Sequence, residues 1–247
     1  MNISVNDDDR RGKGPSSKAV YETLHDEILN LVQRPGRLLD EATLAERFKL
    51  SRSPIREALI RLVGDGLAAV LPNRSTIVSP IELEAFPKYV EALGIAHRLN
   101  CRLAAENRSN DDLDAMVAAN EYLRNSIETE DYLLVSAANK ACNMAVARAG
   151  RNPYLAAFYE RLLDERRRMF NLHIEHLGKA HLANQLYQQH DLMLKAIRSG
   201  EPDLADNLAF DQTRQFRESF LEFMRRDQAA PIDLGKSVLS SRDSNVS

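Results

Sequence analysis

The chain has 247 residues, which is enough for two ordinary domains, and 44% of its side chains are hydrophobic while tryptophan is absent. Its net charge of −3 means that any surface that attracts a polyanion must be local. Cys101 and Cys142 have no CxxC partner, which argues against a Cys-rich zinc site and fits a cytoplasmic protein, and no apolar run is long enough to cross a membrane.

The first predicted element is a helix that ends before Pro35. Residues 1–16 are charged and polar and lack the apolar core of a signal peptide, so we expect a disordered tail there. Apolar side chains then recur at helical spacing at Tyr21, Leu24, Ile28, Leu31 and Val32. The sequence Arg34-Pro-Gly-Arg37 ends this helix.

Residues 44–63 predict a short helix, a turn and a second helix. The second helix has one apolar face, made by Ile55, Ala58, Leu59, Leu62 and Val63. Ser51 or Ser53 can cap its start, and Pro54 is tolerated only in a first turn. Gly64 and Gly66 end it. This order of elements is typical of a helix that enters the major groove of DNA.

The exposed side of the second helix is basic. Residues 47–61 contain five basic side chains and one acid. Arg52 and Arg56 are four positions apart and project from one face, and an arginine fork matches guanine or a phosphate. We therefore expect DNA contacts from Arg52 and Arg56, with Ser51 and Ser53 positioning the helix on phosphate. The alternative is an ordinary solvated basic surface.

Two short β-like runs follow the second helix, at 67–71 and 76–79, around a polar turn. They predict a hairpin whose tip carries Arg74, a further candidate for DNA contact. Residues 17–79 together are interpreted as a winged helix-turn-helix.

Beyond a predicted linker at 80–87, every segment of the chain has a helical pattern. We expect residues 88–227 to form one all-helical domain, with a disordered tail at 228–247. The predicted helices cover about 89–106, 110–127, 129–149, 153–176, 181–198 and 201–226. The fold class is therefore mostly α: an N-terminal winged helix-turn-helix, then an all-α antiparallel bundle of six or seven helices.

Several motifs resemble those of GntR-family transcription regulators of the FCD subfamily. They are Leu44-Ala-Glu46, Ser51-Arg-Ser-Pro-Ile-Arg-Glu-Ala-Leu59, Asp65-Gly-Leu67, Gly150-Arg-Asn-Pro153 and Ala196-Ile-Arg-Ser-Gly200. The resemblance implies a homodimer that binds a palindromic double-stranded DNA operator, more commonly as a repressor. It also implies a helical domain that binds a small effector, commonly a carboxylate or a sugar acid. Relatives usually have glycine after the wing arginine, where this chain has Ser75, and serine is the costlier residue if φ is positive.

The resemblance also locates a metal site that this chain has largely lost. Relatives hold a divalent ion with an Asp-x3-His pair and two later histidines, which fall here on Asn139, Asn143, His190 and Gln212, with His97 on the first bundle helix. Amide oxygens are weak ligands for zinc. We therefore expect no metal or other cofactor, with zinc or a similar divalent ion as the alternative.

The same residues predict a polar pocket without a metal. His97, Asn139, Asn143, His190 and Gln212 would offer several hydrogen-bond donors and acceptors to a polar effector. The alternative is a satisfied polar network that binds nothing.

Three further features have a less specific interpretation. Arg166-Arg-Arg168 is expected to serve the surface or an intersubunit contact, although one of the three could neutralise an acidic effector. His173 and His176 are expected to be a solvated helix end. Tyr154, Phe158 and Tyr159 are expected in core or dimer packing.

We expect a regulator and not an enzyme, because the chain shows no nucleophile–base spacing, phosphate loop or intact metal set. A constitutive DNA-binding regulator with a degenerate helical domain that binds nothing is the remaining alternative. No membrane partner is expected.

Overall fold

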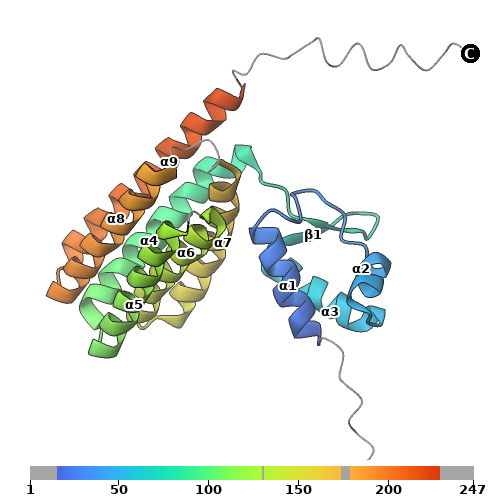
Figure 1. Ribbon diagram of the computed structural model, residues 1–247, viewed down its shortest axis with the longest axis horizontal. Helices are drawn as coiled ribbons and strands as arrows, with labels where there is room; N and C mark the ends of the chain where they lie inside the picture. Colours follow the sequence, from blue (N-terminus) through green and yellow to red (C-terminus); the bar gives the residue numbers. More distant parts are fainter. Residues whose placement is uncertain (1–15, 130, 174–178, 229–247) are drawn as a thin grey trace, which may run out of the picture.

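The structure, a computed structural model, describes residues 16–129, 131–173 and 179–228. It has an N-terminal lobe, which we call the head (residues 16–79), beside a lobe of long helices, which we call the bundle (residues 86–228) (Figure 1). The predicted mostly α architecture is confirmed. The predicted disordered tails lie outside the described residues, apart from Ser16 and Gln228.

The head contains the helices α1 (Ser17–Leu29), α2 (Glu41–Phe48) and α3 (Arg52–Gly64), followed by the strands β1 (Ala68–Val70) and β2 (Thr76–Val78). The strands pair antiparallel, with Ala69 opposite Ile77, and a bridge from Leu38 to Ile77 extends the small sheet. Polar caps fix the helix starts: the Ser16 side chain accepts from Ala19 N, and the Asp40 side chain accepts from Thr43 N.

The three helices and the hairpin close around one apolar core. Its buried members come from every element of the head: Val20, Leu24, Ile28, Leu29, Leu39, Leu44, Ile55, Ala58, Leu59, Leu62, Leu67, Ala68 and Val78. Burial of the predicted apolar face of α3 leaves the opposite face, with its arginines, in solvent.

The segment between the lobes is shorter than the predicted linker. A 3₁₀ turn covers Leu83–Ala85, and α4 (Phe86–Asn107) begins three residues before the predicted start, with Pro87 in its first turn. Phe86 is buried, and its ring centroid lies 4.7 Å from that of Phe220 in the last helix. The end of the predicted linker therefore belongs to the bundle core.

The bundle continues with α5 (Asn110–Glu128), α6 (Tyr132–Ala149), α7 (Pro153–His173), α8 (Lys179–Ser199) and α9 (Pro202–Gln228). Ser109 starts α5 with a capping box, in which its side chain and that of Asp112 satisfy each other's backbone N–H groups. The N-cap of α6 is Asp131, so the helix begins at Tyr132 and not at the predicted Thr129; the Asp131 carboxylate accepts from two backbone N–H groups of the first turn.

The bundle core has separate apolar clusters that share no buried member with the core of the head. In Figure 1, α7 lies on the side of the bundle that faces α1, and these two helices are in contact. None of the described helices is long and apolar enough to cross a bilayer.

Candidate functional site

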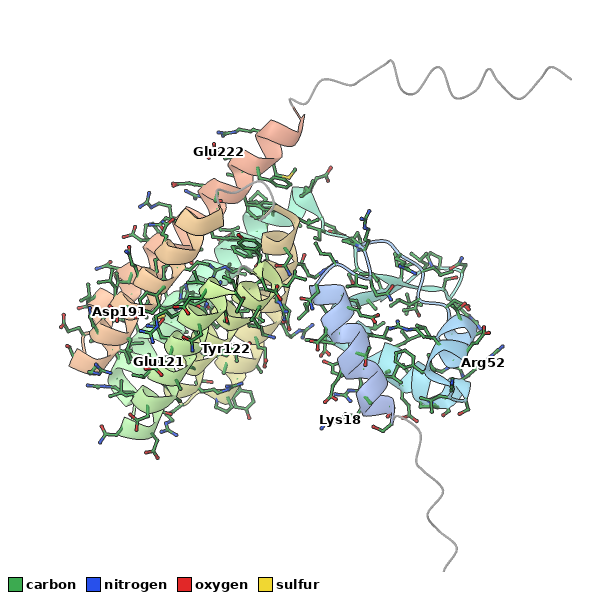
Figure 2. The ribbon with its side chains drawn as sticks, viewed as in Figure 1. Lys18, Arg52, Glu121, Tyr122, Asp191 and Glu222 are labelled. Atoms are coloured by element: carbon green, nitrogen blue, oxygen red, sulfur yellow. The ribbon has the colours of Figure 1, made fainter. Side chains whose placement is uncertain are left out.

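The start of α3 is an exposed basic part of the head. Ser51 is the N-cap residue, as predicted, but its side chain makes no capping hydrogen bond. Ser51, Arg52 and Ser53 are all exposed. Arg52 lies on the side of the head away from the bundle (Figure 2). Hydroxyls and a guanidinium at a helix N-terminus are suited to bind phosphate.

Arg56 is on the same face but is held by an acid. Its Nε and Nη2 donate to the two carboxylate oxygens of Glu41 at 3.0 and 2.8 Å. This fork joins α3 to the start of α2, and each charge shifts the pKa of the other group: that of Glu41 is lowered and that of Arg56 is raised, mainly through the shared hydrogen bonds. One edge of the Arg56 guanidinium is thereby occupied, and Nη1 remains for another acceptor.

Two other basic side chains near the helix-turn-helix also have partners within the head. Arg47 forms a two-point ion pair with Glu27 of α1. The Arg61 guanidinium lies 3.9 Å from the centroid of the Tyr21 ring. Among the described residues, Arg52 has no ion-pair partner. It is therefore the α3 arginine that is most available for DNA.

The wing brings Arg74 to the same opening as Arg52. Both line a cavity of about 420 Å³ beside the start of α2, together with the acids Asp40 and Glu41. The positive φ of the turn falls on Arg74, at 66°, and Ser75 has no positive φ, so the cost of serine at that position does not arise. Asn73 Oδ1 accepts from the Ser75 backbone N–H at 3.0 Å and closes the turn.

In the bundle, the predicted effector residues come together from four helices. His97 (α4), Asn139 and Asn143 (α6), His190 (α8) and Gln212 (α9) are all buried. His190 Nε2 lies 2.7 Å from Asn139 Oδ1, and Asn143 Nδ2 donates to the Asn139 carbonyl at 2.8 Å. Gln212 Nε2 donates to the backbone carbonyl of Gln189 at 3.2 Å. We call these five residues the polar cluster.

Two further residues, which the sequence did not point to, contact the polar cluster. The Tyr159 ring stacks on His97 with centroids 5.5 Å apart, and its hydroxyl donates to Asn143 Oδ1 at 3.1 Å. Thr213 Oγ1 lies 3.4 Å from His97 Nδ1. Tyr159 was expected in core or dimer packing, and it is indeed buried, whereas Tyr154 is 87% exposed. Only its neighbours in space distinguish Tyr159 from the other aromatic residues of α7.

The two histidines of the polar cluster are neutral. Burial, and after it the positive charge of Arg166, lowers the pKa of both His97 and His190 to about 3. Neutral imidazoles offer one donor and one acceptor each.

Arg166 is a buried cation beside the polar cluster. Its side chain is 9% exposed, its Nε has no hydrogen-bond partner, and it forms no ion pair with the described residues. The guanidinium carbon lies 5.1 Å from the Phe216 ring centroid. Arg166 and Asn139 line a cavity of only about 10 Å³, which is room for about one water molecule. Any larger ligand must displace side chains here.

The expected surface role of the arginine run is wrong for two of its members. Arg166 is buried, and the side chain of Arg168 is fully buried, where it pairs with Glu165 at 2.8 Å and donates to the carbonyl of Ser79. Arg167 is half-buried and donates to Asn30. The sequence pattern could not distinguish these positions because three consecutive residues point in three directions from a helix.

The family profiles account for both lobes. The profile described as "Bacterial regulatory proteins, gntR family" matches residues 16–78, and the profile described as "FCD domain" matches residues 98–211. The chain belongs to the GntR family. The resemblance inferred from the motifs is thereby confirmed, and the family and the names of its members are those of transcription regulators and not of enzymes.

Curated relatives carry names of the same kind. The chain is 35% identical over 69 residues to the HTH-type transcriptional repressor RspR of Escherichia coli (strain K12), a match that spans 28% of this chain and 30% of the relative. It is 26% identical over 228 residues to the HTH-type transcriptional repressor NanR of Citrobacter rodentium, covering 79% of this chain and 83% of NanR. The chain thus spans under a third of RspR but most of NanR.

Solved structures share the fold. McbR/YncC of E. coli superposes with a TM-score of 0.73 at 21% identity, covering 83% of this chain and 97% of that one. A GntR regulator from Rhodococcus sp. RHA1 superposes with a TM-score of 0.68 at 19% identity, covering 85% and 97%.

In this GntR-family chain the polar cluster does not fit the divalent ion that the family site suggests. Its donors are two imidazoles and three amides, with no carboxylate or thiolate. Among the described residues, no group of three or more His, Cys, Asp or Glu side chains could hold a metal. His176, half of the other histidine pair, lies outside the described residues.

Proposed function

We propose that this chain is a ligand-responsive repressor that binds a palindromic DNA operator as a homodimer in the cytoplasm. Arg52, Arg56 and Arg74 contact DNA from α3 and the wing, and Ser51 and Ser53 position α3 on phosphate. A small carboxylate bound in the bundle changes operator affinity. The names of the relatives RspR and NanR, both transcriptional repressors, support the sign of regulation.

The DNA half of the proposal is supported by the exposed basic start of α3. Arg52 and Arg74 line the same opening, and no described acid pairs with Arg52. A major-groove helix flanked by a wing needs this arrangement of cations.

The observation that carries the effector half is the buried Arg166. A buried guanidinium with no ion-pair partner in the described part of the chain is costly, so the site favours an anion, and a carboxylate matches the guanidinium fork. Asn139 lines the same small cavity as Arg166, and the charge of Arg166 acts on His97 and His190. With Asn143 and Gln212 of the polar cluster, they offer neutral groups for the remaining polar atoms of a ligand. We propose that the effector binds these groups directly, without a metal, because the donor set is poor for zinc.

The test is thermal unfolding of the full chain in chelator, with added zinc, and in chelator with acetate, lactate, succinate, citrate or gluconate. A ligand that binds the native state raises the melting temperature. We expect at least one acid to raise it, and the same acid to weaken binding to a duplex that the protein selects from a random-sequence pool. The shift should vanish in Arg166→Met and persist in Arg217→Met, a matched change at an exposed arginine of α9.

Other results would contradict parts of the proposal. Stabilisation by zinc alone would mean that the two histidines still form a metal site. If no acid changes either the melting temperature or operator affinity, the bundle is a structural domain of a constitutive DNA-binding regulator. Unaltered operator affinity in Arg52→Ala and Arg56→Ala would exclude α3 as the recognition helix.

A further inference from the structure

The end of α1 is held to the bundle by two side chains of α7. Asn171 Nδ2 donates to the backbone carbonyl of Leu29 at 2.8 Å, and Arg167 Nη2 donates to Asn30 Oδ1 at 2.8 Å. The Leu29 carbonyl belongs to the last turn of α1, where no helical partner is available. Asn171 therefore completes the end of a head helix from the bundle.

The same helix also holds the point at which the chain leaves the wing. Arg168 Nη2 donates to the backbone carbonyl of Ser79, directly after β2, and Nη1 of the same guanidinium donates to Glu165. The end of α1 and the exit from the wing are thus both hydrogen-bonded to one stretch of α7, residues 167–171. This stretch therefore holds two separate points of the head.

The other face of that turn reaches the polar cluster. Arg166 is adjacent in sequence to Arg167 but points about 100° away around the helix, towards Asn139 and Phe216. Because a hydrogen-bonded helical turn moves as a unit, a displacement of Arg166 is transmitted to Arg167, Arg168 and Asn171.

The three arginines are incompletely satisfied as they stand. The Nε atoms of Arg166, Arg167 and Arg168 are all buried without a hydrogen-bond partner, and so is Oδ1 of Asn171. A buried donor or acceptor without a partner is costly. This cost lowers the free-energy difference between the present position of α7 and one in which these atoms have partners.

The joint beside α7 leaves space for a rearrangement. A cavity of about 650 Å³ lies between the lobes, lined by Tyr21 and His25 of α1 and by Lys140, Arg161 and Asp164 of the bundle. The contacts across it are polar, such as the 3.7 Å approach of His25 Nε2 to Asp164 Oδ2. Polar interfaces between domains generally permit relative motion.

We propose that α7 is the rigid connection between effector and DNA, and that Arg167, Arg168 and Asn171 are the positioning residues for the head. An anion that draws in Arg166 shifts the turn 166–171, which moves the end of α1 and the exit of the wing together. In a dimer on a palindrome, a small change of head position alters the fit to both half-sites. The role of the anion rests on the proposed function, whereas the mechanical link does not.

The mechanical link is tested without any ligand, by amide hydrogen exchange of the full chain. In Arg166→Met, whose changed side chain has no hydrogen bond or ion pair with the described residues of the head, amides at residues 28–33 and 79–82 should exchange about tenfold faster, as expected when local hydrogen bonds weaken. Arg166→Lys, which keeps the charge, should show a smaller change. The control is Arg161→Ala, which faces the same joint without a hydrogen-bond partner among the described residues and should leave these amides unchanged.

A second variant tests transmission of the signal. The double variant Arg167→Ala/Asn171→Ala should keep the rise in melting temperature produced by the active acid but lose the effect of that acid on operator affinity. A response equal to that of wild type would overturn the proposal, as would exchange changes in Arg166→Met confined to the bundle. If no acid acts on the wild type, the proposed function fails while the exchange experiment still decides the role of α7.

Discussion

The head and the bundle place their candidate functional groups in opposite environments. In the head, Arg52 and Arg74 are exposed cations beside one opening, and the apolar core lies on the far side of α3. In the bundle, the polar cluster and Arg166 are buried, and the adjoining cavity has room for about one water molecule. The cations of the head are accessible without a rearrangement, whereas the bundle must rearrange to admit a ligand. Such a rearrangement is what couples binding to a change of shape.

The largest expected effect concerns the buried arginine at the joint. Arg168→Ala leaves Glu165 without its partner and the Ser79 carbonyl without its donor, and it creates a cavity. We expect a loss of about 3 kcal/mol in the free energy of unfolding, measured by urea denaturation. A change under about 0.5 kcal/mol, the range typical of surface substitutions, would contradict the assignment of Arg168 to the joint.

The buried histidines predict acid sensitivity of the bundle. Their pKa is about 3 in the folded chain and 6.5 in the unfolded chain, so the unfolded state binds more protons between these values. The contribution of these histidines to the free energy of unfolding is fully present above pH 6.5. It falls as the pH drops towards 3, by up to about 1.4 kcal/mol per pH unit for each histidine. Urea denaturation at pH 7 and pH 5 measures this loss. His97→Phe should have a smaller loss, and an equal loss would contradict the prediction.

The head should respond in DNA affinity and not in stability. We expect Arg52→Ala to weaken binding to the selected operator about 10- to 100-fold, with little change in melting temperature. Arg56→Ala should weaken it too, but its effect should depend on Glu41, which holds the Arg56 fork. Glu41→Gln alone should weaken operator binding, because it loosens the Arg56 fork. In an Arg56→Ala background, Glu41→Gln should have no further effect. Additive effects of the two changes would show that the pair does not act as a unit.

The smallest expected effect is at Tyr159, which joins His97 to Asn143. Tyr159→Phe removes the hydroxyl and leaves Asn143 Oδ1 without that donor, so we expect a loss of about 1 kcal/mol. Phe158→Ala, at a half-exposed site on the same helix, serves as the comparison for lost apolar surface. No loss in Tyr159→Phe would mean that the hydroxyl bond does not contribute.

How far sequence predicts structure also differs between the two lobes. In the head, apolar spacing, the positions of the serine at the N-cap and of Pro54, and the glycines predict where α3 starts and ends, and the apolar spacing predicts which face is exposed. The pairing of Arg56 with Glu41 could not be predicted, because these residues are 15 positions apart and meet only when α2 crosses α3. The two strands of the wing were placed correctly, but nothing in the sequence indicated that the positive φ of its turn falls on Arg74.

In the bundle, helical periodicity predicted the elements to within a few residues. The polar cluster came from the family resemblance, because its members lie on four helices and no local pattern connects them. For Arg166–Arg168 the sequence left open that one arginine could neutralise an acidic effector, but it did not identify Arg166 and Arg168 as buried. A run of three arginines normally indicates a surface, and only tertiary packing shows that this run lies between the two lobes.

The central claim is that an acid bound at Arg166 controls the head. Its most direct test is operator affinity of wild type and Arg166→Met, measured by fluorescence anisotropy with and without the acid that stabilises the wild type. The account predicts that the acid weakens DNA binding by the wild type and has no effect on Arg166→Met, while both proteins bind DNA in its absence. An equal response of the two proteins to the acid would contradict it.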